Sequence, residues 1–213
     1  SDVYKRQDKK PDNARIGEAL YRVAKELQGY ISNLEKIRVP VIAAIQGGCI
    51  GGAVDMVTAC DIRLASKEAF FCIQEINIGM AADVGTLQRL PKIIPDSKMR
   101  EMAYTGRRMY AEEAKESGLI SNMYETQKEM LDGANKLAKE IASKSPLAIY
   151  GLKAVMNFSR AHTVADSLEY KAQWSGAMLS QRDMTEAMTA NMEKRDASFD
   201  KLVDVKKFNE SDS

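Results

Sequence analysis

The sequence contains few residues of the kinds that build metal centres and disulfide frameworks. Its 213 residues include one histidine and three cysteines. Three is an odd number and no Cys-x-x-Cys motif is present, so we expect neither a disulfide framework nor a zinc ribbon, and a reducing compartment is favoured. The single histidine excludes a His-rich metal site and disfavours a Ser-His-Asp triad. We therefore expect no bound metal.

An excess of charge and a long apolar run are also missing. The 31 Lys and Arg residues are balanced by 30 Asp and Glu residues, which leaves a net charge of +1. Without a basic field, binding to nucleic acid or to an anionic membrane is not expected. The longest uncharged stretch, 39–54, contains Pro40 and four glycines. A transmembrane helix needs ~20 mostly apolar residues, so no membrane span is predicted.

Apolar periodicity predicts an α/β chain in which strands precede residue 125 and long helices follow it. Apolar residues three and four positions apart over 16–34 are typical of an amphipathic helix, capped by Asp12 or Asn13. The apolar run 39–45 is typical of a strand buried on both faces in a parallel sheet. Further strands are predicted at 62–65, 69–73 and 119–124, short helices at 53–59, 86–90, 97–104 and 111–117, and long helices at 127–143, 147–159, 164–180 and 184–196.

The sharpest local motif is the glycine cluster Gly-Gly-Cys-Ile-Gly-Gly over residues 47–52. A strand followed by glycines and a helix exposes backbone N–H groups that can bind a phosphate or stabilise an oxyanion. The sequence contains neither the Gly-Lys-Ser/Thr of a Walker A loop nor the Gly-x-Ser-x-Gly of a nucleophile elbow. Cys49 is a candidate nucleophile, although its one candidate base, His162, lies in a distant helical region. A tight turn that needs glycine only for close packing is the structural alternative.

Three carboxylates near this motif are candidates for proton transfer. Asp55 falls in the first turn of the helix after the glycines, where helix capping alone would explain it. Glu75 follows an aromatic strand in an apolar setting, and Asp83 lies in a loop with almost no other polar residue. Apolar surroundings disfavour the charged form of a carboxyl and suit it to general acid–base catalysis. A surface position is the alternative for Glu75 and Asp83.

These motifs resemble the crotonase (enoyl-CoA hydratase/isomerase) superfamily. The resemblance covers residues 14–200 and is carried by the segments 40–47, 51–55, 59–63, 75–79 and 85–91. Within the superfamily, Ala-Ala-Asp-Val-Gly over 81–85 is most similar to the Δ3,5-Δ2,4-dienoyl-CoA isomerases. Enoyl-CoA hydratases tend to have a small residue in place of Asp83 and a glutamate in place of Asp55.

The resemblance implies an α/β fold of stacked ββα turns, followed by helices that build homotrimers, often paired into hexamers. It divides the chain into a disordered or non-native leader (1–12), a crotonase-like core (13–145) and a C-terminal helical region (146–213). The methionines at 178, 184, 188 and 192 fall at helical spacing, which predicts a core or a subunit interface. Compared with the family, we expect the chain to be truncated at its N-terminus and to lack the region that supplies the first oxyanion donor.

The activity implied is an isomerase that converts 3,5-dienoyl-CoA to 2,4-dienoyl-CoA in fatty-acid β-oxidation. The Gly52 N–H would hold the thioester oxygen, with Gly51 and Gly48 completing the substrate-binding turn. Glu75 and Asp83 would be the acid/base pair, Glu75 acting nearest the thioester, and Asp55 a third acidic residue in the same pocket. No cofactor is implied, because coenzyme A is part of the substrate. The location implied is the mitochondrial matrix or the peroxisome.

Two alternatives remain open. An enoyl-CoA hydratase would use Asp55 and Glu75 to add water across a double bond. A non-catalytic member of the fold would bind acyl-CoA or assemble without turnover.

Overall fold

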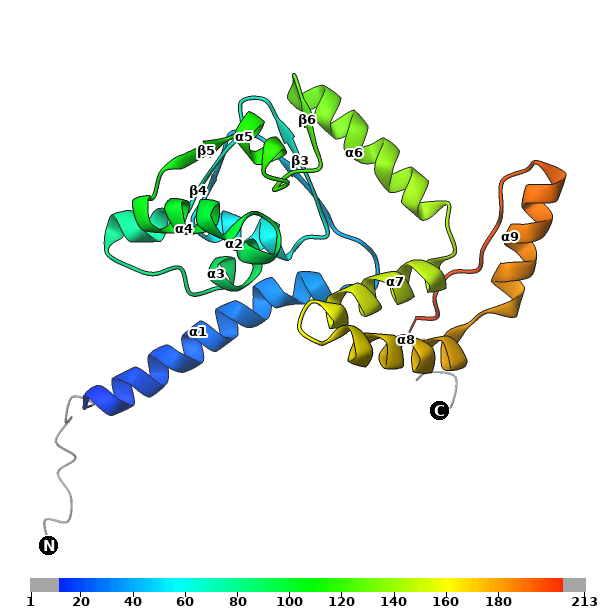
Figure 1. The fold of residues 1–213 in the computed structure, drawn as a ribbon, viewed down its shortest axis with the longest axis horizontal. Coiled ribbons are helices and arrows are strands. Elements are labelled where there is room, and N and C mark those ends of the chain that lie inside the picture. The colour runs from blue at the N-terminus through cyan, green and yellow to red at the C-terminus, as the bar shows by residue number, and fades with distance from the viewer. Residues whose placement is uncertain (1–11, 205–213) are drawn as a thin grey trace, which may run out of the picture.

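The structure is a computed structural model that describes residues 12–204 (Figure 1). The predicted leader therefore lies outside the described residues, except for Asp12, whose carboxylate accepts a hydrogen bond from the Arg15 N–H and caps the first helix. The helices are α1 (Asn13–Lys36), α2 (Gly52–Ala59), α3 (Thr86–Arg89), α4 (Asp96–Thr105), α5 (Ala111–Glu116), α6 (Gln127–Ala142), α7 (Pro146–Ser159), α8 (Val164–Met178) and α9 (Gln181–Glu193). The strands are β1 (Ile42–Ile45), β2 (Gly48–Ile50), β3 (Ile62–Ser66), β4 (Phe70–Cys72), β5 (Arg108–Tyr110) and β6 (Asn122–Tyr124), with 3-10 turns at Gln74–Ile78 and Leu90–Lys92.

The strands form two small sheets. One has the order β1-β3-β6 with parallel pairs, and Ile45 of β1 lies opposite Ala65 of β3. The other has the order β2-β4-β5, in which β2 and β4 are parallel and β5 is antiparallel to β4. Because β2 and β4 are parallel, their carboxyl ends lie together, and the chain enters α2 and the turn Gln74–Ile78 from the same edge.

The glycine cluster differs from the single turn that was predicted. Residues Gly48–Ile50 form strand β2, and a left-handed glycine stands on each side of it, Gly47 with φ 64° and Gly51 with φ 56°. Residues that carry a side chain rarely adopt such φ values, so glycine is required at both bends. The strand was missed because glycine has a low strand propensity, while pairing with β4 supplies the hydrogen bonds that stabilise it.

The core lies between the two sheets and the short helices, and its largest fully buried apolar side chains include those of Phe71, Leu90, Met102, Met109 and Leu119. Burying one such side chain contributes ~1.5–3 kcal/mol. The predicted helices are all present, which confirms the periodicity argument. Strand β5 was not predicted, because three residues are too few for a visible pattern.

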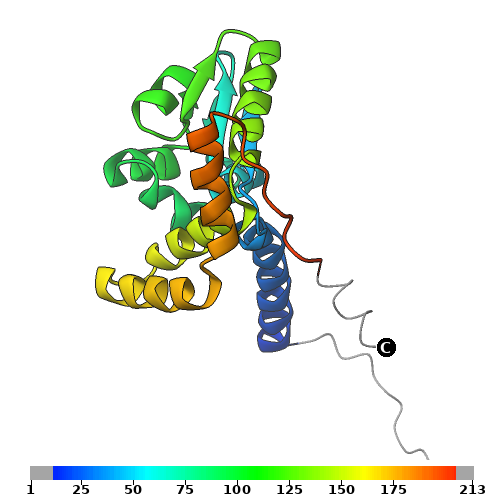
Figure 2. The same cartoon turned by 90° about the vertical axis from the view of Figure 1, so that its right-hand side faces the viewer.

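One predicted burial pattern is wrong. Strand β1 was expected to be buried on both faces, but Ala44 is exposed while Ile45 is buried, so the described residues cover only one face at this end of the strand. Helix α1 carries the predicted apolar stripe, yet Leu20 is 63% exposed and no residue of α1 is buried. The N-terminal half of α1 projects from the rest of the structure (Figures 1 and 2).

The C-terminal helices form a separate layer beside α1 (Figure 1). Helix α7 packs against α8, and α9 follows at the outer side of this layer (Figures 1 and 2). The methionine stripe is not core, since Met188 is 61% and Met192 is 75% exposed. A subunit interface stays a prediction for these side chains, as does the division into a core and a helical region. None of the described helices combines the length and apolarity needed to cross a membrane.

Candidate active site

The site begins at the N-terminus of α2. The Gly51 N–H donates to the Cys72 carbonyl (3.0 Å), which ties the turn to the end of β4. Gly52 is the first residue of α2 and is exposed, and a Cβ built on it would meet no atom within 4 Å. The N–H of a first helical residue has no partner within its helix. The Gly52 N–H donates to no backbone carbonyl among the described residues, so it can donate to an oxygen atom of a ligand.

Glu75 lies directly against this turn. A Cβ built on Gly51 would be 3.2 Å from Glu75 Oε1, so glycine at position 51 leaves room for the carboxylate as well as meeting its positive φ. Glu75 Oε2 is buried and has no hydrogen-bond partner among the described residues. Leaving a buried acceptor unpaired costs ~1–3 kcal/mol. A sheltered carboxylate with one unpaired oxygen is well suited to take a proton from a bound molecule.

Asp55 is fully buried, with 0% of its surface exposed. Its Oδ1 accepts a hydrogen bond from the Thr86 N–H at 2.6 Å, while Oδ2 is buried without a partner among residues 12–204. Thr86 begins α3, whose N-cap is Gly85, a residue with no side chain to cap it. The capping alternative for Asp55 is therefore supported for α3 and not for its own helix, α2.

Asp83 is exposed, and only its backbone is held: its carbonyl accepts a hydrogen bond from Gln28 Nε2 at 2.8 Å. The expectation that its apolar neighbours would shelter this carboxylate is wrong for the described residues. Those neighbours do not surround it, because Met80 and Ala81 are themselves exposed and only Ala82 is buried.

Gly48 is explained by packing. A Cβ on Gly48 would lie 3.0 Å from the Phe70 ring and 3.1 Å from Ile50 Cδ1, so a larger residue would push against β4. Strand β2 separates Gly48 from the N-terminus of α2. The structure thus brings together Gly51, Gly52 and Glu75, and it does not bring Gly48 to them.

The nucleophile alternative for Cys49 is wrong. Cys49 is buried, and burial raises the pKa of its thiol to about 12, so the reactive thiolate is scarce near neutral pH. His162, its candidate base, is exposed between α7 and α8. The His162 ring stacks on Phe158 at 3.7 Å, and its Nδ1 is hydrogen-bonded to the Phe158 carbonyl.

A family model described as Enoyl-CoA hydratase/isomerase matches residues 12–202. The chain belongs to this family. It is 47% identical over 200 residues to the mitochondrial Delta(3,5)-Delta(2,4)-dienoyl-CoA isomerase of Homo sapiens, which covers 92% of this chain and 61% of the relative. It is 47% identical over 191 residues to the peroxisomal enzyme of the same name from Arabidopsis thaliana, covering 90% of this chain and 69% of the relative.

The solved structures agree with this assignment. The crystal structure of an enoyl-CoA hydratase from Bacillus anthracis has a TM-score of 0.80 at 28% identity, covering 89% of this chain and 72% of that one. The predicted crotonase-like α/β fold is therefore confirmed. The chain spans 61% of the length of the human relative.

Three residues that hold the loop carrying Asp83 were not predicted from the sequence. They are Gln28, Thr86 and Arg89. A signal for the first was present: Gln28, Ser32 and Glu35 are spaced by four and three residues, which places them on one face of α1. All three side chains contact the segment 83–89, Gln28 through the Asp83 carbonyl and the other two through Arg89. Ile31 and Leu34 of the apolar stripe are half-buried as well.

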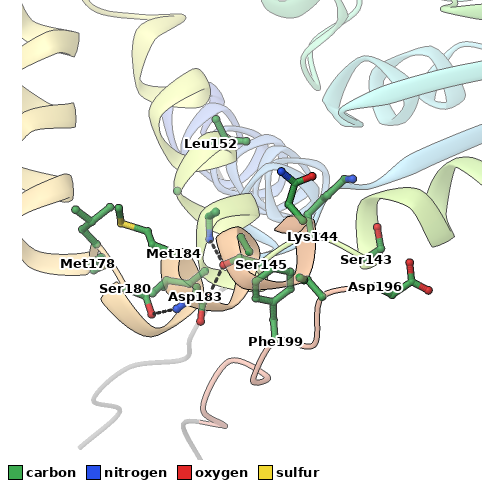
Figure 3. Close-up of a pocket in the computed structure, with 18 of the residues that line it drawn as sticks. Ser143, Lys144, Ser145, Leu152, Met178, Ser180, Asp183, Met184, Asp196 and Phe199 are labelled. Carbon is green, nitrogen blue, oxygen red and sulfur yellow. Dashed lines mark hydrogen bonds between the residues drawn. The ribbon is translucent and has the colours of Figure 1, made fainter. Parts of the chain in front are cut away.

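A hollow of about 670 Å³ lies elsewhere, between α7, α8, α9 and the residues after α9 (Figure 3). Leu152, Trp174 and Phe199 are among its apolar lining residues. At one end the Ser145 hydroxyl donates to the Asp183 carboxylate. No predicted site residue lines this hollow within the described chain. Residues 12–204 also contain no group of three His, Cys, Asp or Glu side chains placed to hold a metal ion.

Proposed function

We propose that this chain carries the proton-transfer carboxylates of an isomerase that converts 3,5-dienoyl-CoA to 2,4-dienoyl-CoA in fatty-acid β-oxidation. The observation that carries the proposal is the position of the Glu75 carboxylate, which lies against Gly51 and has one buried oxygen without a hydrogen-bond partner among the described residues. The next residue, Gly52, has a backbone N–H that is available to a ligand. The relatives named as dienoyl-CoA isomerases support the choice of substrate.

The reaction begins at the thioester. The Gly52 N–H donates to the thioester oxygen while Glu75 removes a proton from C2, and the electron pair of that C–H bond spreads into a conjugated enolate. One such donor is typically worth ~2.7–4 kcal/mol of transition-state stabilisation. Asp83 then delivers a proton to C6, which moves the two double bonds from positions 3 and 5 to positions 2 and 4. General acid–base catalysis contributes ~10²–10⁴-fold.

Two carboxylates suit this chemistry because the two carbons are four positions apart. Glu75 lies against Gly51, the N-cap of α2, and the loop of Asp83 is joined to the first turn of α2 by the hydrogen bond between Asp55 and Thr86. These contacts support a role for both carboxylates at the helix end that would hold the thioester. Asp55 acts as the anchor of this loop, because its Oδ1 accepts from the Thr86 N–H and its side chain, unlike that of the half-buried Glu75, has no exposed surface for a substrate to reach.

The same proposal includes the setting of the enzyme. It needs no cofactor besides the coenzyme A of its substrate, and it works in the mitochondrial matrix or the peroxisome, as the names of the relatives indicate for those proteins. It assembles as a homotrimer or hexamer through α7–α9. The support for assembly is the apolar surface that these helices expose, which includes Leu152, Met156, Leu168, Leu179, Met188 and Met192.

The test is an assay of two reactions with the same chain. We expect 3,5-dienoyl-CoA to be converted to the conjugated 2,4-dienoyl thioester, followed by its ultraviolet absorbance, and 2-enoyl-CoA not to be hydrated. Glu75→Gln should abolish the conversion, while Glu140→Gln, an exposed position on α6, should leave it unchanged. Hydration in place of isomerisation would favour the hydratase. Binding of acyl-CoA without either reaction would favour the non-catalytic alternative.

A further inference from the structure

The segment 83–86 is held at every one of its four residues. The Asp83 carbonyl accepts from Gln28 (2.8 Å), and the Val84 carbonyl accepts from Arg89 Nη1 (3.4 Å). The Thr86 N–H donates to Asp55 (2.6 Å). Gly85, at φ 137°, leaves no room for a side chain, because a Cβ there would lie 1.7 Å from Arg89 Nη1. These contacts together restrain the backbone that carries Asp83.

Arg89 is itself fixed by α1. Its Nε and Nη2 donate to the two oxygens of the Glu35 carboxylate at 3.0 and 2.8 Å, and Nη2 also donates to the Ser32 hydroxyl at 2.9 Å. A two-point pairing of guanidinium and carboxylate fixes orientation as well as distance. The Arg89 side chain is only 13% exposed, so solvent screens this pair weakly.

The Asp83 carboxylate has no comparable support of its own. Its side chain is exposed and makes no hydrogen bond to any described residue. Gln28 and Glu35, in contrast, line a hollow of about 410 Å³ together with Gly85 and Arg89. The position of the carboxylate is therefore set by the backbone of the loop, and the backbone is set from α1.

We propose that Gln28, Glu35 and Arg89 are positioning residues that hold Asp83 for proton transfer at the distal carbon. The inference rests on the proposed function, because it needs Asp83 to be a proton-transfer group. Catalytic groups have to be held within ~0.5 Å of their productive geometry. A misplacement of ~1 Å can lower a rate about 10²-fold. The polar face of α1 supplies this constraint from 55 residues away along the chain.

The test uses Gln28→Met, which keeps the length of the side chain and removes the donor. The matched control is Gln88→Met, because Gln88 lines the same hollow but makes no side-chain hydrogen bond to a described residue. Two measurements are made on the full chain and both variants. The first is amide hydrogen exchange of the segment 83–86. The second is isomerisation of 3,5-dienoyl-CoA in D₂O, with deuterium entry at C2 followed separately.

With Gln28→Met we expect faster amide exchange in 83–86 and a fall in the kcat of isomerisation of up to ~10²-fold. KM and deuterium entry at C2 should stay at the wild-type values, because Glu75 is untouched. The control should behave as the wild type in all of these. Gln28→Asn keeps the amide donor on a shorter side chain, so its kcat should lie between those of Gln28→Met and the wild type.

If the amides of 83–86 exchange in Gln28→Met at the wild-type rate, the proposal is overturned, whatever the activity of the variant. An equal loss of isomerisation and of C2 exchange would also overturn it, since that pattern indicates general damage to the fold. A wild-type chain that exchanges at C2 without forming the 2,4-diene would contradict the proposed function. The amide exchange of 83–86 would then decide by itself whether the loop is held from α1.

Discussion

The ammonium group of Lys153 lies 2.7 Å from the Asp61 carboxylate, and the Lys153 side chain is only 3% exposed. The same ammonium donates to the carbonyls of Leu34 (3.0 Å) and Val39 (3.1 Å), so all three of its protons are used. Asp61 accepts in addition from the Val41 N–H (2.7 Å). One buried lysine therefore joins α7 to the end of α1 and to the segments that lead into β1 and β3.

Lys153→Met should strongly destabilise the chain. The substitution keeps the bulk of the side chain but removes the positive charge that pairs with Asp61 and the donor to two carbonyls, and breaking a buried pair typically costs about 3–5 kcal/mol. Urea denaturation measures the loss. Lys128→Met is the matched control, since the pair with Asp132 is on the surface, with Lys128 86% exposed, and such pairs contribute ~0.3–0.5 kcal/mol. Equal losses in the two variants would contradict the prediction.

Asp55→Asn should retain more activity than Asp55→Ala. An asparagine keeps an oxygen that accepts from the Thr86 N–H, whereas alanine removes the cap of α3, and losing a cap costs ~0.5–2 kcal/mol. Steady-state isomerisation rates and melting temperatures of the two variants give the comparison. If Asp55 transferred a proton, both variants would lose activity to the same extent, because neither side chain can ionise.

Gly51→Ala should reduce both stability and activity. Alanine at φ 56° and ψ −123° is in a sparsely populated backbone region and is strained by ~1–3 kcal/mol. Its methyl group would also stand 3.2 Å from Glu75 Oε1 and displace the carboxylate. Gly29→Ala in α1 is the control, because a Cβ there meets no atom within 4 Å and alanine favours a helix. A Gly51→Ala variant with wild-type kcat would show that the position of Glu75 does not limit the reaction.

Cys49 makes stability depend on pH in the alkaline range. Burial raises the pKa of its thiol to about 12, while an unfolded cysteine ionises near ~8.5. The unfolded state therefore loses this proton first, and the stabilisation present below pH ~8.5 is lost as pH rises towards 12. Urea denaturation of wild type and Cys49→Ala should show the gap between them narrowing from pH 8 to pH 11. A constant gap would indicate that the thiol is not desolvated.

Met192→Glu should weaken the proposed assembly without unfolding the chain. The side chain is 75% exposed, so a charge is tolerated in a single chain and not in an apolar interface. Light scattering after size exclusion should give a trimer or hexamer for the wild type and a smaller species for the variant. Lys139→Glu, on α6, should assemble as the wild type. A wild type that elutes as a monomer at every concentration would refute the assembly.

Local patterns were reliable guides to the helices and to the family. The spacing of apolar residues predicted the helices, because a period near 3.6 needs only neighbours in the sequence. The same pattern did not show how little of α1 is buried, since an apolar stripe shows that a face can be buried and not that a partner covers it. The exposure of Ala44 was missed for a similar reason, because burial of a strand face depends on whether another element covers it.

The sequence alone was sufficient to predict the family, which the comparisons confirm. The resemblance rested on local motifs that include residues 51–55, 75 and 83. The contacts that surround each carboxylate were decided by the packing of distant segments. Asp55 meets Thr86 across 31 residues, Gln28 meets Asp83 across 55, and Lys153 meets Asp61 across 92. A polar side chain can be satisfied by any suitable donor that folding brings within hydrogen-bond distance. Its partner is therefore set by tertiary structure, whereas helical periodicity is set by the neighbouring residues.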